Sequence, residues 1–451
     1  MTPRPAVATA PDRAQVLDTM RRATIFMVEK VATQGGFVWS YLPDMSRRWG
    51  EIEARPTMIW MQPPGTPTMG HLFLDAHHAT GGEYYYRAAE QVAGALMLAQ
   101  HPAGGWNYLF DTAGEAPRRQ WYNTVGRNAW RLEEFQHDWG NATFDDGGTS
   151  QSTEFLLRLF LEKHDSKYKA ALDRAIQFVL DSQDPVGAWP QRFPLKHEFS
   201  HHAKPDYTSF LTFNDEVTAG NVEHLLRFYR LTGDAKFLAR IPEALDWLDG
   251  VKLPPDIAAI AGGGRTHPTF VELGTNKNLY VHRRGSNVVI GEYYVDGDPH
   301  DTIGHYNSFR QVDVAQLRKD YLAAKALPTA EASKGSPLRP SAGRIPLPRY
   351  FAVREPSVFG PVATAAPAER VARVVGSLDG QGRWLAPLGS ISHPYRGAGS
   401  KEFAPGDFSR TQVGDESDTS PYLADPGIVG ISTSTYIRNM SELIRVLDGR
   451  R

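Results

Sequence analysis

Hydrophobic positions recur at helical spacing in two segments of the chain that share one register. The first segment runs from Thr143 to Arg158, and the second runs from Thr212 to Arg227. Each position of the second copy lies 69 residues after its counterpart in the first. Both copies combine a short extended run, a turn with acidic side chains and an amphipathic helix. The pattern therefore predicts a repeated structural unit.

Glycine and tryptophan follow several of the predicted helices. Helices are predicted over three further segments, at about residues 12–32, 83–100 and 166–183. Gly104 and Trp106 match Gly187 and Trp189 at an offset of 83 residues. Glycine suits a left-handed backbone after a helix, and tryptophan packs a connection against the core. We favour this structural role for both, and we keep the two tryptophans as candidates for stacking on a sugar ring.

The unit that emerges is a pair of helices joined by a short link. A last helix at about residues 434–447 begins in the same way, and we expect it to pair with the start of the chain and close a ring. Residues 270–294 have the composition of extended segments. Stacked helical hairpins with their loops on one face predict an all-α fold, an (α/α) toroid or incomplete barrel. We expect one catalytic domain over residues 1–451, with repeats at about 12–250, a loop-rich insertion at about 251–365 and a closing repeat at about 366–451.

Composition narrows the classes of partner. A net charge of −2 gives no electrostatic footprint for nucleic acid or for an anionic membrane. The absence of cysteine excludes disulfides, thiol catalysis and thiolate metal sites. No run of about 18 apolar residues predicts a membrane span. The first ten residues lack the apolar centre of a signal peptide, and we expect a secreted or periplasmic monomer whose signal peptide is not part of this chain.

The acidic turns allow two interpretations. Asp146 and Asp215 occupy matching positions just before a predicted helix, where a carboxylate caps free N–H groups and complements the helix dipole. Two such turns at matching points of a repeat also bring their carboxylates to the same rim of a closed array. The ten Trp and eighteen Tyr residues suit a groove in which sugar rings stack. A functional site at this rim is therefore one of the two hypotheses.

Three motifs resemble those of a known family. They are Gly187-Ala188-Trp189-Pro190-Gln191-Arg192-Phe193-Pro194, Thr212-Phe213-Asn214-Asp215 and the upstream turn Thr143-Phe144-Asp145-Asp146-Gly147. In combination they are similar to the pectate lyases of polysaccharide lyase family 10, over about residues 80–250. Two departures concern the substrate. A family lysine is missing from Gly104-Gly105-Trp106-Asn107-Tyr108, and Ala188 replaces a glycine.

This resemblance implies cleavage of an acidic polysaccharide, pectate or a similar uronic-acid polymer, by β-elimination. It also implies calcium, with Asp145, Asp146 and Asp215 as oxygen ligands and Asp215 as part of the catalytic set. The family's base is an arginine, carried by position onto Arg283 or Arg284, although arginine is a poor base at its ordinary pKa. The remaining candidates would bind substrate: Trp106, Trp189, Arg192, Lys204, Tyr207 and Asn214.

Two other functions remain open from the residues. A hydrolase acting on unsaturated uronyl oligosaccharides could use Asp146 and Asp215 as acid and base, and the separation of the two carboxylates would decide its mechanism. A protein that binds acidic glycans without cleaving them could also retain this scaffold, since fold alone does not fix function.

Overall fold

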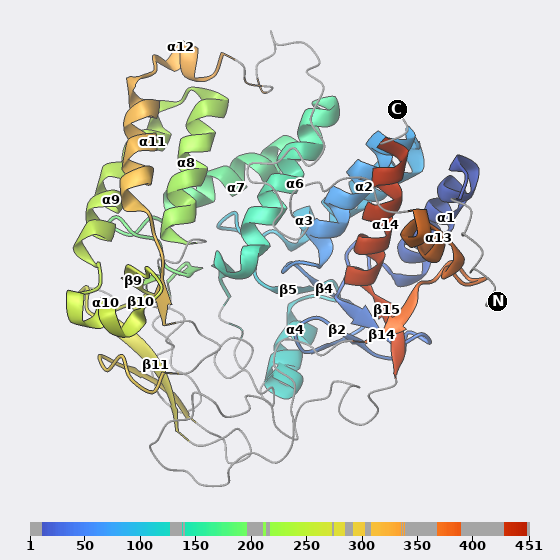
Figure 1. Ribbon diagram of the computed structural model, residues 1–451, viewed down its shortest axis with the longest axis horizontal. Helices are drawn as coiled ribbons and strands as arrows, with labels where there is room; N and C mark the ends of the chain where they lie inside the picture. The colour runs from blue at the N-terminus through green and yellow to red at the C-terminus, as the bar shows by residue number, and fades with distance from the viewer. Residues whose placement is uncertain are drawn as a thin grey trace, which may run out of the picture.

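Paired helices stand side by side across the molecule, and short strands run along one edge of the array (Figure 1). The computed structural model describes residues 11–126, 138, 140–195, 211–212, 217–272, 275–284, 292–302, 308–334, 336, 338, 368–388 and 428–448. The α-helices are α1 (Arg13–Phe26), α2 (Thr66–Thr80), α3 (Glu83–Ala99), α4 (Glu115–Trp121), α6 (Gly148–Lys163), α7 (Lys169–Asp181), α8 (Thr218–Thr232), α9 (Ile241–Gly250), α10 (Pro255–Ala261), α11 (Val314–Ala326), α12 (Thr329–Ala332), α13 (Ala368–Gly376) and α14 (Thr433–Asp448). None of these described helices is both long enough and apolar enough to cross a bilayer.

Helices α2, α6 and α8 each begin one unit of the repeat, and α3, α7 and α9 return beside them. Along the array, α2 packs on α6, α6 on α7, α7 on α8 and α8 on α9. Helix α14 packs against α1 and α2, so the two ends of the chain meet as predicted. Helices α11 and α1 lie at opposite sides of Figure 1. The all-α fold of an incomplete barrel of helical hairpins is confirmed.

Several helix boundaries follow the sequence pattern closely. The predicted helix at 83–100 is α3, and the predicted last helix at 434–447 is α14. The first predicted helix is α-helical only to Phe26 and continues as a π-helical turn over Met27–Val31. The segment expected to be a loop-rich insertion contains α11, which packs against α8 and α9 and so extends the array.

The closing segments, Gly104–Trp106 and Gly187–Trp189, have the same geometry in both copies. The backbone φ angle is 112° at Gly104 and 102° at Gly187, in the region that favours glycine. A Cβ at Gly104 would lie 2.3 Å from the carbonyl oxygen of Arg174, and one at Gly187 would lie 2.6 Å from that of Glu243. Each glycine therefore lets its connection touch the backbone of the return helix of the next unit.

The tryptophans of these segments are held inside the protein. The indole Nε1 of Trp106 donates to the carbonyl of Leu96 at 2.8 Å, and that of Trp189 donates to the carbonyl of Val179 at 2.7 Å. The side chains of both are fully buried. A fainter third copy repeats the contact, because Trp384 Nε1 donates to the carbonyl of Val374 at 2.9 Å. The expected structural role is thus observed. Neither Trp106 nor Trp189 is exposed to a ligand, which corrects their assignment to substrate binding.

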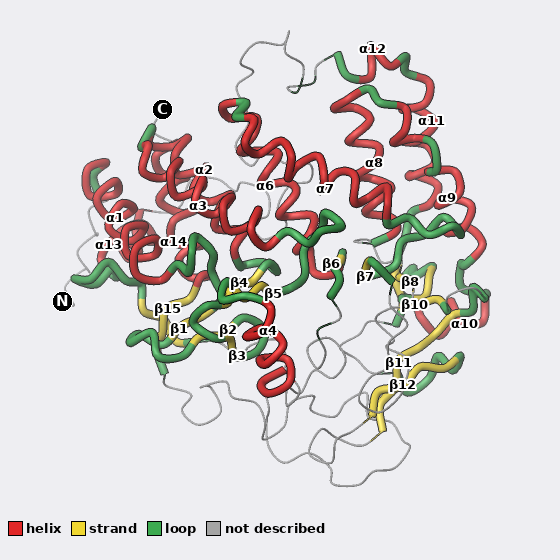
Figure 2. The backbone as a smooth tube through the Cα atoms, turned by 180° about the vertical axis from the view of Figure 1, so that it is seen from behind, coloured by secondary structure: helices red, strands yellow, loops and turns green. Residues whose placement is uncertain are grey.

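Short strands join the start of each unit to its end. The strands are β1 (Ser40–Tyr41), β2 (Arg48–Trp49), β3 (Glu53–Ala54), β4 (Met58–Trp60), β5 (Leu109–Asp111), β6 (Ala142–Thr143), β7 (Arg192–Phe193), β8 (Leu211–Thr212), β9 (His267–Pro268), β10 (Phe270–Val271), β11 (Asn278–Arg284), β12 (Glu292–Asp296), β13 (Phe309–Arg310), β14 (Leu385–Pro387) and β15 (Val429–Ser432). Strand β4 pairs with β5, β6 with β7, and β8 with β10, all antiparallel. The strands lie along the lower edge of the helices when seen from behind (Figure 2). The turns that begin the units are therefore gathered at this edge.

A single main hydrophobic core runs through the units, from Val16 on α1 to Leu447 on α14. It also contains a buried ion pair. The Nη2 of Arg158 on α6 donates to a carboxylate oxygen of Asp75 on α2, and its Nη1 donates to the carbonyl of His71 at 3.1 Å. The side chains of Arg158 and Asp75 are both fully buried. This pair ties the first helix of one unit to the first helix of the next.

Candidate active site

The turn Asp145–Asp146, called the acidic turn below, lies between β6 and α6. Its backbone leaves the extended conformation of Thr143 and passes through a left-handed position at Asp146, where φ is 52°. Aspartate tolerates this conformation better than most residues. Gly147 follows with φ of 71° and caps α6 without any side-chain hydrogen bond. Asp146 is exposed and does not cap the helix, so the first of the two interpretations of this residue is not supported.

Asp145 is held by donors from the closing segments of two successive units. The hydroxyl of Tyr108 donates to its Oδ2 at 2.9 Å, and the side-chain amide of Gln191 donates to the same oxygen. Its Oδ1 accepts the backbone N–H of Asp146 at 3.0 Å. The carboxylate is half-buried. Its orientation is therefore fixed by a phenol that precedes β5 and an amide that precedes β7.

Asp146 is joined to the first unit of the array through Gln62. The Nε2 of Gln62 donates to Asp146 Oδ2 at 2.7 Å and lies 3.2 Å from Glu51 Oε2. The Oε1 of Gln62 accepts from the indole Nε1 of Trp60 at 2.5 Å. Because the indole can only donate, it determines which end of the amide faces the two carboxylates. Gln62 and Glu51 are both buried, at 2% exposure each, so buried groups fix the orientation of the Gln62 amide.

Arg192 lies next to the acidic turn but inside the protein. It pairs with Thr143 across β6 and β7, and only 2% of the residue is exposed. Its guanidinium carbon lies 5.7 Å from the centre of the Tyr108 ring, on the phenol that donates to Asp145. Arg192, which we expected to bind substrate, is thus buried next to the Tyr108 ring. From there its positive charge lies close to the phenol that donates to Asp145.

The two candidate base residues lie in a sheet that also contains the start of the third unit. The sheet order is β12-β11-β10-β8, and β11 carries Arg283 and Arg284 opposite Tyr293 and Glu292. Strand β8 ends at Thr212, directly before the second acidic turn of the sequence. The fold therefore brings β8 into the same sheet as the strand that carries the two arginines. Four candidate residues lie outside the described part of the chain: Lys204, Tyr207, Asn214 and Asp215.

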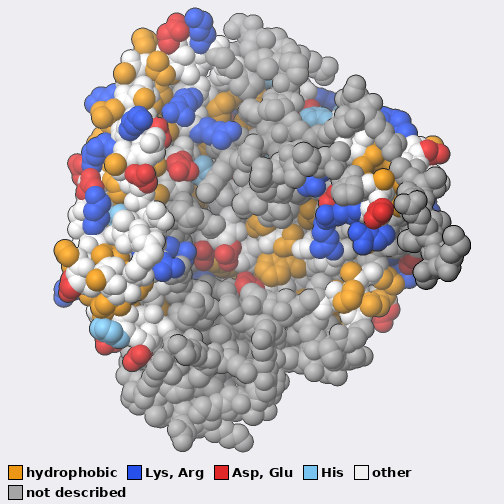
Figure 3. Space-filling view, in the orientation of Figure 1, with side chains coloured by type: hydrophobic (Ala, Val, Ile, Leu, Met, Phe, Trp, Pro, Cys, Tyr) orange, Lys and Arg blue, Asp and Glu red, His pale blue; other side chains and the backbone are white. Residues whose placement is uncertain are grey.

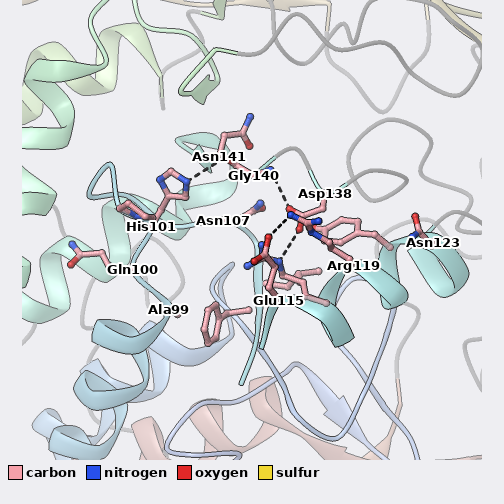
Figure 4. Close-up of a pocket in the computed structure, with 15 residues that line it drawn as sticks. Ala99, Gln100, His101, Asn107, Glu115, Arg119, Asn123, Asp138, Gly140 and Asn141 are labelled. Carbon is pink, nitrogen blue, oxygen red and sulfur yellow. Dashed lines mark hydrogen bonds and ion pairs between the residues drawn. The ribbon is translucent and has the colours of Figure 1, made fainter. Parts of the chain in front are cut away.

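A pocket of about 750 Å³ opens beside α4, and we call it the α4 pocket. In Figure 4, Gln100 and His101 stand on one side of this space, and Glu115, Arg119 and Asn123 stand on the other. Its volume is within the range of small-molecule sites. The lining is mainly polar and comprises Ala99, Gln100, His101, Pro102, Asn107, Leu109, Phe110, Glu115, Arg118, Arg119, Tyr122, Asn123, Asp138, Gly140 and Asn141.

Charges of both signs meet in the α4 pocket. Arg118 Nε donates to Asp138 Oδ2 at 2.9 Å, and Arg119 pairs with Glu115 one turn earlier on α4. Burial raises the pKa of Tyr122, so its phenol stays protonated. The wider face has the same mixed character, with acidic side chains next to hydrophobic ones near its middle (Figure 3). The pocket thus offers neutral and charged hydrogen-bonding groups together, which suits a hydroxyl-rich ligand.

Sequence patterns found part of this arrangement. Gln62 matches Asp145 at the offset of 83 residues, so the repeat predicts that the turn of the first unit lies next to the acidic turn of the second. Tyr108 and Gln191 belong to the two closing motifs, but nothing in their spacing shows that both donate to Asp145. Arg118 and Asp138 have no counterpart in the other repeats.

The acidic turn fits calcium by donor type but not by donor number. Calcium takes six to eight oxygen ligands, and Asp145 and Asp146 supply carboxylate oxygens. Within the described ranges, no group of three or more His, Asp or Glu side chains is arranged to hold a metal ion. A complete set would therefore require oxygens from elsewhere, such as Asp215 or a bound sugar acid.

Comparisons with known proteins agree with part of the predicted resemblance. Residues 111–240 match the family model of pectic acid lyase. No curated protein matches the chain. A family 10 polysaccharide lyase from Cellvibrio cellulosa aligns at 14% identity over 60% of this chain and 87% of its own, with a TM-score of 0.38.

Two further solved structures align with the chain. A mutant of the Cellvibrio cellulosa lyase, in complex with trigalacturonic acid, aligns at 17% identity over 46% of this chain and 58% of its own, with a TM-score of 0.27. The α-1,6-mannanase GH76A of a Salegentibacter species aligns at 12% identity over 97% of this chain and 99% of its own, with a TM-score of 0.37. Structural likeness at these scores carries no argument about activity. The match to pectic acid lyase over residues 111–240 spans the acidic turn, α6, α7 and Gln191, and it is this part of the chain that has the sequence pattern of a polysaccharide lyase.

Proposed function

We propose that this protein cleaves a uronic-acid polysaccharide of the pectate type by β-elimination at the acidic turn. The observation that carries the proposal is the position of Asp145 and Asp146 within the matched residues 111–240. Their carboxylates stand at the edge of the array, oriented by Tyr108, Gln191 and Gln62. These three donors are neutral, and so they orient the carboxylates without cancelling their charge.

The reaction itself makes defined demands on such a site. A base removes the C5 proton of a uronic acid, the electron pair forms the C4–C5 double bond, and the C4–O glycosidic bond breaks. The leaving oxygen takes up a proton. The proton at C5 becomes acidic enough only when the neighbouring sugar carboxylate is neutralised, and a bound calcium ion would supply that charge.

The residues of the chain would divide these tasks. Asp145 and Asp146 would hold calcium together with Asp215, and their fixed orientation would place it without reorganisation during the reaction. Arg283 or Arg284 would take the proton at C5, and this role requires surroundings that favour the neutral guanidine. Strand β11 carries both arginines in the sheet that ends at the second acidic turn. Lys204, Tyr207 and Asn214 remain proposed substrate contacts.

The test is a panel of uronic-acid polymers assayed for unsaturated ends by ultraviolet absorbance, with and without a chelator. We expect absorbance to rise with at least one polymer and to be lost with the chelator. Asp146→Asn should lower the rate at least about tenfold, as expected for a group that acts through a metal site. Asp173→Asn is the matched control, because Asp173 is an exposed carboxylate on α7 paired with Lys169.

Other outcomes would replace the proposal. New reducing ends without absorbance, insensitive to the chelator, would assign a hydrolase acting on uronyl oligosaccharides. Saturable binding of an acidic glycan without any product would assign a binding protein. If the protein neither binds nor cleaves any polymer of the panel, an acidic polysaccharide is not its ligand.

A further inference from the structure

The α4 pocket contains an arginine, Arg118, whose side chain bonds through its Nε. Arg118 Nε donates to Asp138 Oδ2 at 2.9 Å, and Asp138 Oδ1 accepts the backbone N–H of Gly140 at 3.1 Å. In the part of the chain that the structure describes, the two terminal nitrogens of Arg118 make no hydrogen bond. The side chain is 24% exposed and lines the pocket. The Nε bond to Asp138 thus restricts the guanidinium, and its terminal N–H groups are left for a ligand of the pocket.

This arrangement suits a ligand carboxylate. A guanidinium presents parallel N–H donors that match the two oxygens of a carboxylate, and such charge-assisted pairs are among the stronger hydrogen bonds. Asp138 balances the charge of Arg118 but uses only the Nε edge. A lysine at this position would provide charge without the planar pair of donors.

The pocket and the acidic turn are joined by residues 107–109. Asn107 and Leu109 line the pocket, whereas Tyr108 between them directs its hydroxyl to Asp145. Asn141, which comes directly before β6 and four residues before Asp145, also lines the pocket. One extended segment therefore serves both places, because successive side chains of an extended chain alternate in direction.

We propose that Arg118 binds the carboxylate of a second uronic-acid residue in the same oligosaccharide whose reacting residue lies at the acidic turn. The proposal rests on the proposed function. The side-chain amide of Asn107, which is partly exposed in the pocket, meets the hydroxyls of this second residue. Asp138 is a positioning residue that holds the guanidinium plane. The α4 pocket is then a specificity subsite for chains that carry acids on more than one sugar.

The test measures KM and kcat for a series of oligouronides of increasing length. In the wild-type protein, KM falls once the chain is long enough to reach the pocket. Arg118→Gln removes that gain and raises KM for the longer oligomers about tenfold or more, as expected for loss of a hydrogen bond to a charged group. The KM for the shortest cleaved oligomer changes little, and so does kcat at every length. Arg118→Lys recovers part of the gain, since it restores charge but not the planar donors.

Two controls separate this site from general effects. Arg438→Gln removes an exposed arginine on α14, far along the chain from the pocket, and leaves KM unchanged at every length. Urea denaturation checks that Arg118→Gln is folded, because it leaves Asp138 without its ionic partner. A partially methyl-esterified oligomer of the same length loses the Arg118-dependent gain, since the ester is uncharged.

The outcomes distinguish this proposal from the function on which it rests. Unchanged KM at all lengths in a folded Arg118→Gln variant that still makes unsaturated ends overturns the subsite and leaves the lyase in place. Calorimetric titration of oligouronides into Asp146→Asn provides a second measurement that needs no turnover. Binding that depends on Arg118, with no product from the wild-type protein, keeps the subsite and removes the lyase.

Discussion

The closing segments of the repeating units are nearly identical from copy to copy, whereas the turns that begin the units differ. At the closing segments, Trp106 and Trp189 make the same contacts, and the backbone N–H of each donates to the hydroxyl of a threonine on the helix that begins a unit, Thr149 or Thr218. At the beginning of the units, the side chains change. The first unit has Gln62 where the second has Asp145, although both turns lie at the same edge.

Burial explains the difference. Each closing segment lies between two units. Its tryptophan donates to a helix carbonyl, and its glycine lies so close to the backbone of the next return helix that any side chain there would displace that helix. The turns at the beginning of the units project from the edge, where an exposed side chain such as Asp146 does not affect the packing. A repeat can therefore keep its framework through one end and carry its chemistry on the other.

The strongest test of this contrast replaces a closing tryptophan. Trp189→Ala should lower the free energy of unfolding by about 3–5 kcal/mol, because a large buried ring and its hydrogen bond to Val179 are lost. Urea denaturation followed by circular dichroism measures the change. Trp106→Ala is the matched variant and should lose a similar amount. A loss below about 1 kcal/mol in either would show that the closing segments are not the framework.

A smaller effect is expected from the amides that hold the acidic turn. Gln62→Leu leaves the indole of Trp60 and the carboxylate of Glu51 without this partner inside the protein, and should cost about 1–3 kcal/mol of stability. Gln191→Leu removes one of the donors to Asp145, so its stability cost should be lower. Both should slow the formation of unsaturated ends about 10- to 100-fold.

The comparison of these two variants checks the separation of framework and chemistry. Denaturation midpoints and initial rates are measured on the same preparations. If Gln191→Leu lost as much stability as Gln62→Leu and kept its rate, the turn would belong to the framework.

The smallest effect concerns the pH dependence of the framework. Burial, together with the charge of Arg158, holds the pKa of His71 well below 6.5. The unfolded chain therefore takes up a proton below about pH 6.5 that the folded protein does not, and stability falls as the pH decreases. One such group contributes up to about 1.4 kcal/mol per pH unit.

His71→Leu removes that contribution. The slope of unfolding free energy against pH between about 6.5 and 5 should then be shallower than in the wild-type protein, by up to the same about 1.4 kcal/mol per unit. Denaturation at several pH values measures it. An identical slope in wild type and His71→Leu would contradict a neutral buried His71.

Local patterns were enough to predict the units of this protein. Helical periodicity found α3 and α14, and the Gly–Trp motifs predicted the closing segments, because each depends on residues close together in the sequence. Helix α11 was not predicted, although its buried Val314, Leu317, Tyr321 and Ala324 have helical spacing. The surrounding proline- and glycine-rich segments obscured that signal.

The sequence by itself determined the repeat, its register and the acidic turn at the start of α6. The tertiary structure decided which side chains hold that turn. Gln62 lies 84 residues from Asp146, and Gln191 lies 46 residues from Asp145, yet both donate to these carboxylates. Packing of one unit on the next sets such distances, and a local pattern contains no information about them. For the same reason the pairing of Arg118 with Asp138, in a segment without a repeat, appears only when the chain is folded.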